Sequence, residues 1–380
     1  MDLQQIRARI DEVDENLVSL FRERMGLSAQ VADYKAEHHL PVLNKARERE
    51  VLARVSELAG EDLEAYSRLL YSVLFDMSRA YQQKKLGREQ SQLAKNVYSA
   101  ALPEGTLFPA RGVVACQGVE GAYSQHACDK LFAAPNILYF RSFEGVFQAV
   151  ANGLCQYGIL PIENSSAGSV VKVYDLMNRH KFHIVRSVRL HIHHQLMAKP
   201  GVKLEQVKEV FSHEQALSQC SLYFEQHSNL KTTPCENTAV AAQMAAQSQR
   251  DDVAAICSPD CAELYGLQVL DDHVQNNSNN YTRFICIARE LAIYPGADRI
   301  SLMLSVPHKP GSLYNMIAKF SVLGLNLTKL ESRPIPGSDF EFLFYVDLEA
   351  SIWRPEVMEL LSQMAQTDGR FVFLGCYSEV

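Results

Sequence analysis

Apolar side chains in the first 34 residues recur at alternating steps of four and three, which is the spacing of one helix face. This seam consists of Ile6, Ile10, Val13, Leu17, Leu20, Leu27, Val31 and Tyr34. It predicts a long first helix that ends at His39, before a break at Leu40 and Pro41. A second helix is expected over residues 44–58 and a third over residues 62 to about 86. The region to residue 88 is therefore expected to be all α, with the seam facing a core.

Arg24 occupies the seam position between Leu20 and Leu27. A guanidinium cannot be deprotonated to escape burial, so the fold must supply an anionic partner or bring an anionic ligand to it. This position is the first indication of a binding site.

From residue 112 the pattern changes to short β-rich runs that alternate with helical stretches, which is typical of an α/β domain. The strands predicted there are 112–116, 156–161, 184–190, 253–257 and 282–288. The last segment has the order strand, helix, strand, strand, helix, strand, at residues 300–306, 311–322, 326–332, 340–348, 355–366 and 371–376. That order fits a small α+β, ferredoxin-like βαββαβ domain.

The chain is thus expected to be multidomain, with boundaries where these patterns change. The expected domains are an all-helical domain at 1–88, an α/β domain at 110–290 and a ferredoxin-like domain at 298–380. A linker is expected at 89–109, after a glycine-poor stretch at 82–96 and around Pro103-Glu104-Gly105.

Composition narrows the class of partner. The 380 residues are 47% hydrophobic and 21% charged, with a formal net charge of -7 and no basic block, which argues against nucleic acid as a main partner. The nine cysteines are scattered and complete no zinc motif, so reduced structural thiols are expected. The first residues resemble no targeting peptide, and no apolar run approaches the ~18 residues of a membrane span. We expect a cytoplasmic protein.

Further cations and neutral donors accompany Arg24 in the helical region. Lys35 follows Arg24 by eleven residues and shares nearly the same side of the helix, so both can line one pocket. Arg7 lies well around the helix and would reach that pocket only from another chain, which predicts an intertwined dimer of three-helix subunits.

The other two helices add polar groups to the same pocket. Asn44 is the expected N-cap of the second helix, with Arg47 and Glu48 in its first turn. Ser78 and Gln82 continue an apolar line on the third helix. Singly, such residues are usually solvated surface groups. Jointly, they indicate a site for a compact ligand with several negative charges.

This set of residues resembles the all-helical chorismate mutase that is fused to prephenate dehydratase in bacterial bifunctional enzymes. The resemblance rests on Ile6-Arg7-Ala8-Arg9-Ile10-Asp11 with Asp14, Glu23-Arg24, Lys35, Arg47-Glu48, Ser78 and Gln82. It implies a Claisen rearrangement of chorismate to prephenate, catalysed by positioning and electrostatics without proton transfer.

The family pattern assigns a role to each of these residues. Arg7 of the partner chain and Arg24 would hold the two carboxylates of chorismate, with Arg47 and Ser78 in support. Lys35 and Gln82 would donate to the ether oxygen, and Glu48 would accept from the substrate hydroxyl. Gln82 carries no proton to lose, which predicts little loss of mutase activity above neutral pH. Asn44 stands where related enzymes carry an aspartate.

Polar clusters follow strands in the α/β region. Residues 117–124 follow a strand and open a helix, which suits either an anion site or a plain tight turn. Residues 160–170 end a strand in a dense set of carboxylate, amide and hydroxyl groups, and residues 212–216 and 279–284 repeat that arrangement.

These clusters, in this order, resemble prephenate dehydratase. The resemblance implies a two-lobed α/β fold like that of periplasmic binding proteins, and a loss of water and carbon dioxide driven by aromatisation. Thr282 would polarise the leaving hydroxyl, with Glu163 or His213 as alternative proton sources. Arg283 would anchor a carboxylate or brace its loop. The expected prephenate-binding residues are Ser124, Glu163, Asn164, Ser165, Thr282 and Arg283. No metal or organic cofactor is expected.

The last domain resembles an ACT regulatory domain, through Pro310-Gly311-Ser312-Leu313-Tyr314 and residues 326–334. The resemblance implies feedback inhibition by L-phenylalanine, which such domains bind between two subunits. The effector-binding residues would be Gly311, Ser312, Leu313, Asn326, Leu327, Glu331 and Ser332. Ser312 replaces a small apolar residue of the usual motif.

Two alternatives stay open at this point. Asn44 favours a monofunctional dehydratase whose helical domain serves only dimerisation. A two-lobed α/β cleft is also found in non-catalytic amino-acid sensors. The residues leave open the choice between prephenate and arogenate, between a homodimer and a higher homo-oligomer, and whether intermediates pass between the sites.

Overall fold

The computed structural model describes residues 2–38, 40, 42–85, 91–335, 341–366 and 369–380. Its chain divides into two compact units, Met1–Lys95 and Asn96–Val380. Each unit is described by itself. Among the described helices, none combines the length and the apolar character that a membrane span requires.

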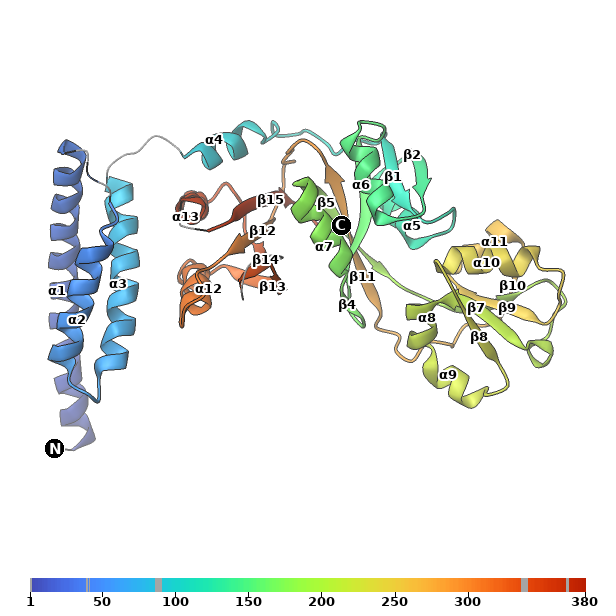
Figure 1. Cartoon of the computed structure of the whole chain (residues 1–380), viewed down its shortest axis with the longest axis horizontal. Coiled ribbons are helices and arrows are strands. Elements are labelled where there is room, and N and C mark those ends of the chain that lie inside the picture. Colours follow the sequence, from blue (N-terminus) through green and yellow to red (C-terminus); the bar gives the residue numbers. More distant parts are fainter. Residues whose placement is uncertain (1, 39, 41, 86–90, 336–340, 367–368) are drawn as a thin grey trace. The chain divides into compact units, whose positions relative to one another are not determined.

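The first unit consists of long helices, as predicted (Figure 1, blue). They are α1 (Leu3–Glu37), α2 (Lys45–Ala59) and α3 (Glu64–Lys85). Asn44 is the N-cap of α2, since its side-chain oxygen accepts a hydrogen bond from the Arg47 amide at 3.0 Å. The predicted ends at His39 and Leu86 and the break at Pro41 lie outside the described residues.

The apolar seam of α1 does not face a core within its own chain, so that prediction is wrong. Ile10 is 52% exposed and Leu20 is 65% exposed, and the other six seam residues are exposed as well. The buried residues of α1 are Ser28, Ala29 and Ala32. α3 thus packs on the face of α1 that carries these small side chains, and the eight apolar residues of the seam stay exposed, although Arg24 reaches α3.

A helix in the predicted linker crosses the division between the two units. This helix, α4 (Gln92–Ser99), ends next to a tryptophan of the C-terminal region. The Tyr98 ring stacks on Trp353 with centroids 6.1 Å apart, and the Leu102 amide donates to the Ile293 carbonyl at 2.9 Å. Much of residues 96–109 is therefore packed against the rest of the second unit.

The α/β region forms two lobes, each built on its own sheet (Figure 1, green and yellow). In the first sheet, of order β2-β1-β3-β11-β5, β4 also pairs with β3. Its strands are β1 (Val113–Gln117), β2 (Asn136–Phe140), β3 (Tyr157–Asn164), β4 (Gly168–Ser169), β5 (His183–His191) and β11 (Tyr281–Ala288). The accompanying helices are α5 (Tyr123–Leu131), α6 (Phe143–Ala151) and α7 (Val171–His180).

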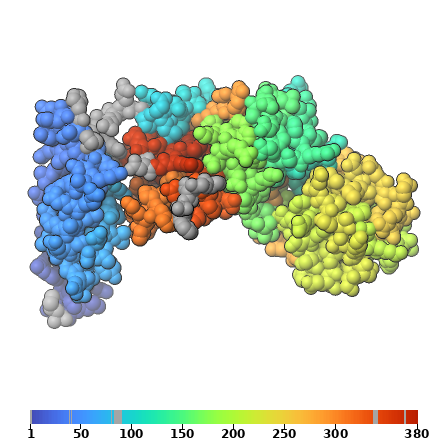
Figure 2. Space-filling model, in the orientation of Figure 1, coloured from blue at the N-terminus to red at the C-terminus, as the bar shows by residue number. Residues whose placement is uncertain are grey.

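The second lobe is one continuous stretch of sequence, and it forms one yellow surface in Figure 2. Its sheet has the order β10-β6-β9-β7-β8. The strands are β6 (Gln195–Ala198), β7 (Glu209–His213), β8 (Lys231–Cys235), β9 (Val253–Cys257) and β10 (Gln268–Asp271). The helices are η1 (Leu204–Gln206), α8 (Glu214–Gln219), α9 (Ser221–Gln226), α10 (Thr238–Gln247) and α11 (Cys261–Tyr265).

The chain leaves the first lobe after β5 and returns to it in β11. β11 lies between β3 and β5 and is antiparallel to both. The predicted two-lobed α/β fold is thereby confirmed. Two chain segments cross between the lobes, one before the second lobe in the sequence and one after it.

The C-terminal region has the predicted βαββαβ order, with a four-stranded sheet of order β13-β14-β12-β15 (Figure 1, orange and red). Its elements are β12 (Arg299–Ser305), α12 (Ser312–Val322), β13 (Asn326–Pro334), β14 (Phe342–Glu349), α13 (Pro355–Ala365) and β15 (Phe371–Tyr377). The predicted start of the third strand, Phe340, lies outside the described residues.

The first lobe and the C-terminal sheet share one apolar core. Ile162, Tyr174 and Ile285 of the lobe belong to the same buried cluster as Met303, Tyr345 and Tyr377. The Tyr345 hydroxyl also donates to the Tyr174 carbonyl at 2.7 Å. The two sheets are therefore packed together through buried side chains.

Candidate functional sites

Arg24 lies half-buried between α1 and α3, where its contacts are uncharged. Its Nη1 donates to Ser78 Oγ at 2.7 Å, and its guanidinium lies 5.9 Å from the ring centroids of Tyr71 and Phe75. Among the ion pairs of the described residues, none provides Arg24 with a carboxylate. The remaining donors of this guanidinium can thus bind an anionic ligand.

Gln82 lies one turn beyond Ser78 and is buried. Its Nε2 donates to Ser28 Oγ at 2.8 Å, whereas its Oε1 has no hydrogen-bond partner among the described residues. Ser28 was not predicted, and the only signal for it was its position one turn after Arg24. A buried amide with an unused acceptor is costly unless a ligand or water completes it.

Lys35 and Glu48 face a common region at the end of α1 and the start of α2. Burial lowers the pKa of Lys35, and the nearby Glu48 carboxylate opposes that shift. Lys35 donates to the Val42 carbonyl, and Glu48 forms an ion pair with Arg79 of α3. Arg79 was missed, because an arginine on a helix gives no signal of its own.

Arg7 and Arg47 lie apart from this group in the single chain. Arg7 is exposed in α1 and precedes Arg24 by 17 residues, or about 26 Å along the helix axis. Arg47 is exposed and pairs with Glu50 at 2.8 Å. One chain therefore brings together Arg24 with Ser78, Gln82 with Ser28, and Lys35 with Glu48, but not Arg7.

In the second unit, Thr282 and Asn164 are neighbours in the register of β11 and β3, and both are buried. Asn164 Nδ2 donates to Thr282 Oγ1 at 2.8 Å and to Asn280 Oδ1 at 2.8 Å. Asn164 Oδ1 accepts from the amides of Ser166 and Ala167 at 3.0 and 2.9 Å. These bonds fix the orientation of the Asn164 amide, with its nitrogen toward Thr282.

A chain of hydrogen bonds leads from the second lobe to Thr282. Gln219, the last residue of α8, donates through Nε2 to Asn164 Oδ1 at 3.3 Å. Gln219 Oε1 accepts from Asn280 Nδ2 at 3.0 Å and contacts His194 Nε2 at 3.2 Å. Because that oxygen only accepts, His194 Nε2 carries the proton. Thr282 Oγ1 accepts at the end of the chain, so its own proton is free to be donated.

His194 lies between β5 and β6, where the chain crosses from the first lobe to the second. It is 3% exposed, and burial lowers its pKa to about 4, so the ring is neutral at pH 7. Neither His194 nor Gln219 was predicted. The run of histidines at 191–194 was a signal for the first, and the sequence contains none for the second.

The predicted serines have other surroundings. Ser165 Oγ accepts from the Tyr281 amide at 2.9 Å and donates to the Asn279 carbonyl at 3.2 Å, which holds two chain segments together. Ser124 is buried in the first turn of α5. In the described part of the chain, no hydrogen bond joins its hydroxyl to Asn164 or Thr282.

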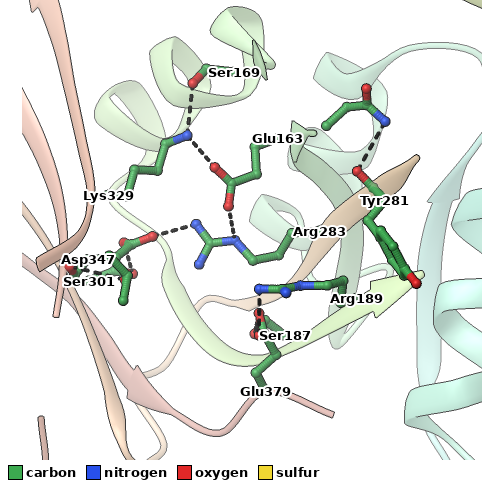
Figure 3. A network of polar contacts seen from close by, with 12 residues as sticks. Glu163, Ser169, Ser187, Arg189, Tyr281, Arg283, Ser301, Lys329, Asp347 and Glu379 are labelled. Carbon is green, nitrogen blue, oxygen red and sulfur yellow. Dashed lines mark hydrogen bonds and ion pairs between the residues drawn. The ribbon is translucent and has the colours of Figure 1, made fainter. Parts of the chain in front are cut away.

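Glu163 and Arg283 do not join the Thr282 group, contrary to the prediction of one common site. Arg283 Nε lies 2.7 Å from Glu163 Oε1 as an ion pair without hydrogen-bond geometry, and Arg283 Nη2 pairs with Asp347 of β14. Lys329 of β13 pairs with Glu163 (Figure 3). Successive residues of a strand point to opposite faces, so these side chains face away from Thr282 and Asn164.

An open cleft lies between the two lobes. Gly118, Val119 and Arg141 line it from the first lobe, and His213, Glu214 and the N-terminal part of α10 line it from the second. His213 is the N-cap of α8, and burial lowers its pKa. Thr282 and Asn164 are not among its lining residues.

The predicted effector residues lie at two opposite ends of the strands of the C-terminal sheet. Gly311 precedes α12 with a φ of 83°, a conformation that favours glycine, and its neighbours Ser312 and Leu313 open the helix. Ser332 is level with Leu304 near the end of β12 that leads to α12, whereas Leu327 is level with Ile300 at the other end.

Two of the effector residues already have polar partners. Asn326 Nδ2 donates to Glu349 Oε2 at 2.7 Å, and Glu331 Oε2 accepts from Ser169 of β4 at 2.8 Å. One chain thus brings Gly311, Ser312 and Leu313 to the same end of the strands as Glu331 and Ser332, and leaves Asn326 and Leu327 at the opposite end.

Two family models match the chain. Residues 6–83 match chorismate mutase type II, and residues 114–292 match prephenate dehydratase. The chain is 31% identical to the bifunctional chorismate mutase/prephenate dehydratase of Escherichia coli K12, over 98% of this chain and 95% of that protein. It is 37% identical to arogenate dehydratase/prephenate dehydratase 1 of Arabidopsis thaliana, over 76% of this chain and 78% of that protein.

Solved structures resemble the second unit. The prephenate dehydratase of Arthrobacter aurescens in complex with L-Phe is 28% identical with a TM-score of 0.64, over 70% of this chain and 89% of that one. A quorum-quenching acylase, GqqA, is 28% identical with a TM-score of 0.62, over 70% of this chain and 98% of that one.

Proposed function

Because this chain belongs to the family of bifunctional chorismate mutase/prephenate dehydratases, we propose that it converts chorismate to prephenate and prephenate to phenylpyruvate, under inhibition by L-phenylalanine. The helical unit carries the first reaction and the two-lobed region the second. The observation that carries the proposal is the direction of the hydrogen-bond chain that ends at Thr282.

The dehydratase role of Thr282 is supported by that direction. Asn164 donates to Thr282 Oγ1, so the threonine proton can point to the hydroxyl that leaves prephenate. The hydrogen bond that Thr282 donates becomes stronger as negative charge builds on the leaving oxygen, while the ring becomes aromatic and carbon dioxide departs. A threonine supplies positioning and a hydrogen bond, and the proton itself needs a further source.

Glu163 and His213 were the alternative proton sources, and their surroundings differ. The carboxylate of Glu163 pairs with Arg283 and Lys329, on the face of the strand opposite to Thr282. His213 lies in the interlobe cleft, where its Nδ1 accepts from the Gln215 amide and Nε2 stays available. We therefore favour His213 over Glu163.

The mutase site is proposed around Arg24, Lys35 and Gln82, with Ser78, Glu48, Asn44 and Arg47 at its margin. Arg24 has no carboxylate partner among the described residues, which suits a ligand carboxylate. Gln82 Nε2 donates one hydrogen to Ser28 Oγ, and its second hydrogen can be donated to an ether oxygen. Ser28 and Arg79 support this site, since they hold Gln82 and Glu48.

An intertwined homodimer follows from the same unit. The seam of α1 is exposed in one chain, and large contiguous apolar surfaces of this kind mark interfaces. A second copy laid along α1 would cover the seam and could bring its Arg7 to Arg24, which the first chain's own Arg7 cannot reach.

The C-terminal region is proposed as an ACT domain that binds L-phenylalanine. Its βαββαβ order and the L-Phe complex of the relative from Arthrobacter aurescens support this assignment. Asn326 and Leu327 lie at the other end of the strands from Gly311, Ser312, Leu313 and Ser332, so a ligand that contacts all of them would need a second subunit.

Prephenate is proposed over arogenate as the substrate. Relatives in plants are named for both compounds, but the E. coli relative matches the mutase region as well. A chain that makes prephenate in one unit supplies the dehydratase directly.

The test follows products by NMR after chorismate, prephenate or arogenate is added to the purified protein, with and without L-phenylalanine. We expect phenylpyruvate from both chorismate and prephenate, suppressed by L-phenylalanine. Turnover of prephenate but not chorismate would leave the helical unit a dimerisation role only. Binding of L-phenylalanine without turnover would identify an amino-acid sensor.

A further inference from the structure

Two neighbouring pairs of residues at the centre of the first sheet point to opposite faces of that sheet. Thr282 and Asn164 are opposite one another in the register of β11 and β3, and so are Arg283 and Glu163 one step along. The first pair joins the polar chain from Gln219, and the second joins the C-terminal sheet. A shift of either strand therefore moves both pairs at once.

A bulge makes the position of these strands adjustable. The register shifts between Arg283 and Phe284, so that Ile162 is an extra residue on β3. Bulges relax the ladder locally and re-aim the side chains beside them. The pairing at Glu163 and Asn164 thus depends on contacts outside the ladder.

Those contacts form a network of charges, which Figure 3 shows from close by. Arg283 is 7% exposed and pairs with both Glu163 and Asp347, while Lys329 pairs with Glu163. Each of these charges has a partner of opposite sign, so removal of one member leaves another without part of its compensation.

Asp347 and Lys329 are held by different parts of the molecule. Asp347 of β14 accepts from Ser301 of β12, and Ser301 in turn contacts the Tyr377 hydroxyl of β15 at 2.7 Å. Lys329 of β13 donates to Ser169 Oγ of β4 at 2.9 Å, in addition to its pair with Glu163. The carboxylate is therefore held within the C-terminal sheet, whereas the ammonium joins that sheet to the first lobe.

We propose that Glu163 and Arg283 are positioning residues, through which Lys329 and Asp347 of the C-terminal sheet hold Asn164 and Thr282 in catalytic geometry. The inference rests on the proposed dehydratase function of Thr282. It assigns the C-terminal sheet a part in basal turnover, separate from the binding of any effector. A displacement of about 1 Å at a reacting group can cost about a hundredfold in rate.

The test compares Lys329→Met with Lys329→Arg and with Asp175→Asn in the full chain. Asp175 of α7 pairs with Arg333 of β13 at 3.6 Å, so the control removes another ion pair between the first lobe and the C-terminal sheet without touching β3 or β11. For Lys329→Met we expect kcat for prephenate to fall at least about tenfold, with KM changed less than about threefold. Lys329→Arg should restore most of kcat, and Asp175→Asn should match wild type.

A double variant separates positioning from general loss of stability. In Glu163→Gln the carboxylate is replaced by a neutral group of the same shape, and adding Lys329→Met should then cost less than about twofold more. Additive losses, or a fall of kcat in Asp175→Asn equal to that in Lys329→Met, would overturn the inference. Thermal unfolding of each variant, read by circular dichroism, identifies any loss that comes from unfolding.

The mutase reaction serves as the internal reference, because its residues lie in the other unit. Equal chorismate turnover in all variants is expected. Wild-type protein that leaves prephenate unchanged would refute the proposed function itself, whereas active wild type with an equally active Lys329→Met would refute only the inference.

Discussion

His194 is a buried side chain between the two lobes, and its protonation links the stability of the protein to pH. It is neutral because burial lowers its pKa to about 4, and it donates to Gln219, which orients Asn164. In the unfolded chain the same ring has an ordinary pKa near 6.5. Between these two values the unfolded state binds the proton and the folded state does not.

The free energy of unfolding should therefore rise with pH between about 4 and 6.5 and stay level above that range. From pH 7 to pH 5 this one group should cost about 2 kcal/mol, out of about 3 kcal/mol for the full shift. Urea unfolding of wild type and His194→Gln at both pH values measures it, because glutamine can still donate to Gln219 but does not titrate. Equal slopes in the two proteins would contradict the assignment.

Lys35 is expected to act in its protonated form, whereas His194 acts in its neutral form, because the ammonium of Lys35 is the group that donates the hydrogen bond. Burial lowers its pKa below 10.5, so the ammonium begins to lose its proton at a lower pH than an exposed lysine does. Because Gln82 has no proton to lose, we expect kcat/KM for chorismate to hold above neutral pH and to fall only as pH rises through the pKa of Lys35. In Lys35→Arg the alkaline fall should disappear, at a cost of about tenfold in kcat. Rate profiles from pH 7 to 10.5 decide this.

At the scale of single residues, the sequence predicted which residues are polar site members better than it predicted which of them lie together. Thr282 and Asn164 were predicted in one site and lie together. Glu163 and Arg283 were placed with them, although alternation along a strand already argues for the other face. The partners that explain the second pair, Lys329 and Asp347, are distant in sequence, and local patterns cannot reveal such contacts.

At the scale of the elements, α1 is the helix whose apolar face is left exposed in a single chain. Eight apolar residues at helix spacing are exposed along one face, although such a face is normally buried. The period of the pattern correctly indicated a helix with an apolar side. It could not indicate whether that side packs within one chain or between two, because both arrangements remove the same surface from water.

A charge placed in the seam should weaken the proposed dimer. For Leu17→Asp we expect the dissociation constant of the dimer to rise more than about a hundredfold, since burial of an unpaired carboxylate costs several kcal/mol. The control is Leu58→Asp at the end of α2, because Leu58 is 80% exposed and lies outside the seam. Sedimentation velocity over a dilution series compares them. Identical behaviour of the two variants would argue against a seam interface.

The strands and helices that were predicted with bounds lie within a few residues of those observed, because turns and alternation are local signals. β9 was predicted with its observed bounds, Val253–Cys257. No bounds were predicted for six strands of the two lobes, which are β2, β4, β6, β7, β8 and β10. The helix α4 was also missed, since it lies in the expected linker. Its polar composition gave no sign of the Tyr98 contact with Trp353, which depends on an exposed aromatic side chain far along the chain.

At the scale of the molecule, the two reactions are assigned to separate units with separate residues. Arg24→Met should lower mutase activity at least about a hundredfold and leave the conversion of prephenate unchanged. Thr282→Val, which removes the hydroxyl at nearly constant volume, should do the reverse. Parallel assays starting from chorismate and from prephenate measure both rates. Loss of both activities in either variant would indicate that the units depend on each other.

The order of the regions and the two-lobed fold could be predicted, since composition and period change at each boundary. The return of the chain to the first sheet followed from resemblance alone. No local property of residues 281–288 distinguishes a strand of the first lobe from one of the second, because both sheets bury apolar strands on both faces.

The return of β11 also constrains how the chain can fold. β11 lies between β3 and β5, yet it is separated from both by the whole second lobe. At about 5–20 residues per second of synthesis, the inner edges of those two strands wait for several seconds without their partner. Unpaired apolar edges of this kind are prone to aggregate, and such long-range pairing folds slowly. The first lobe therefore depends on the second for its completion, and a chaperone that shields β3 and β5 during synthesis would raise the yield of folded protein.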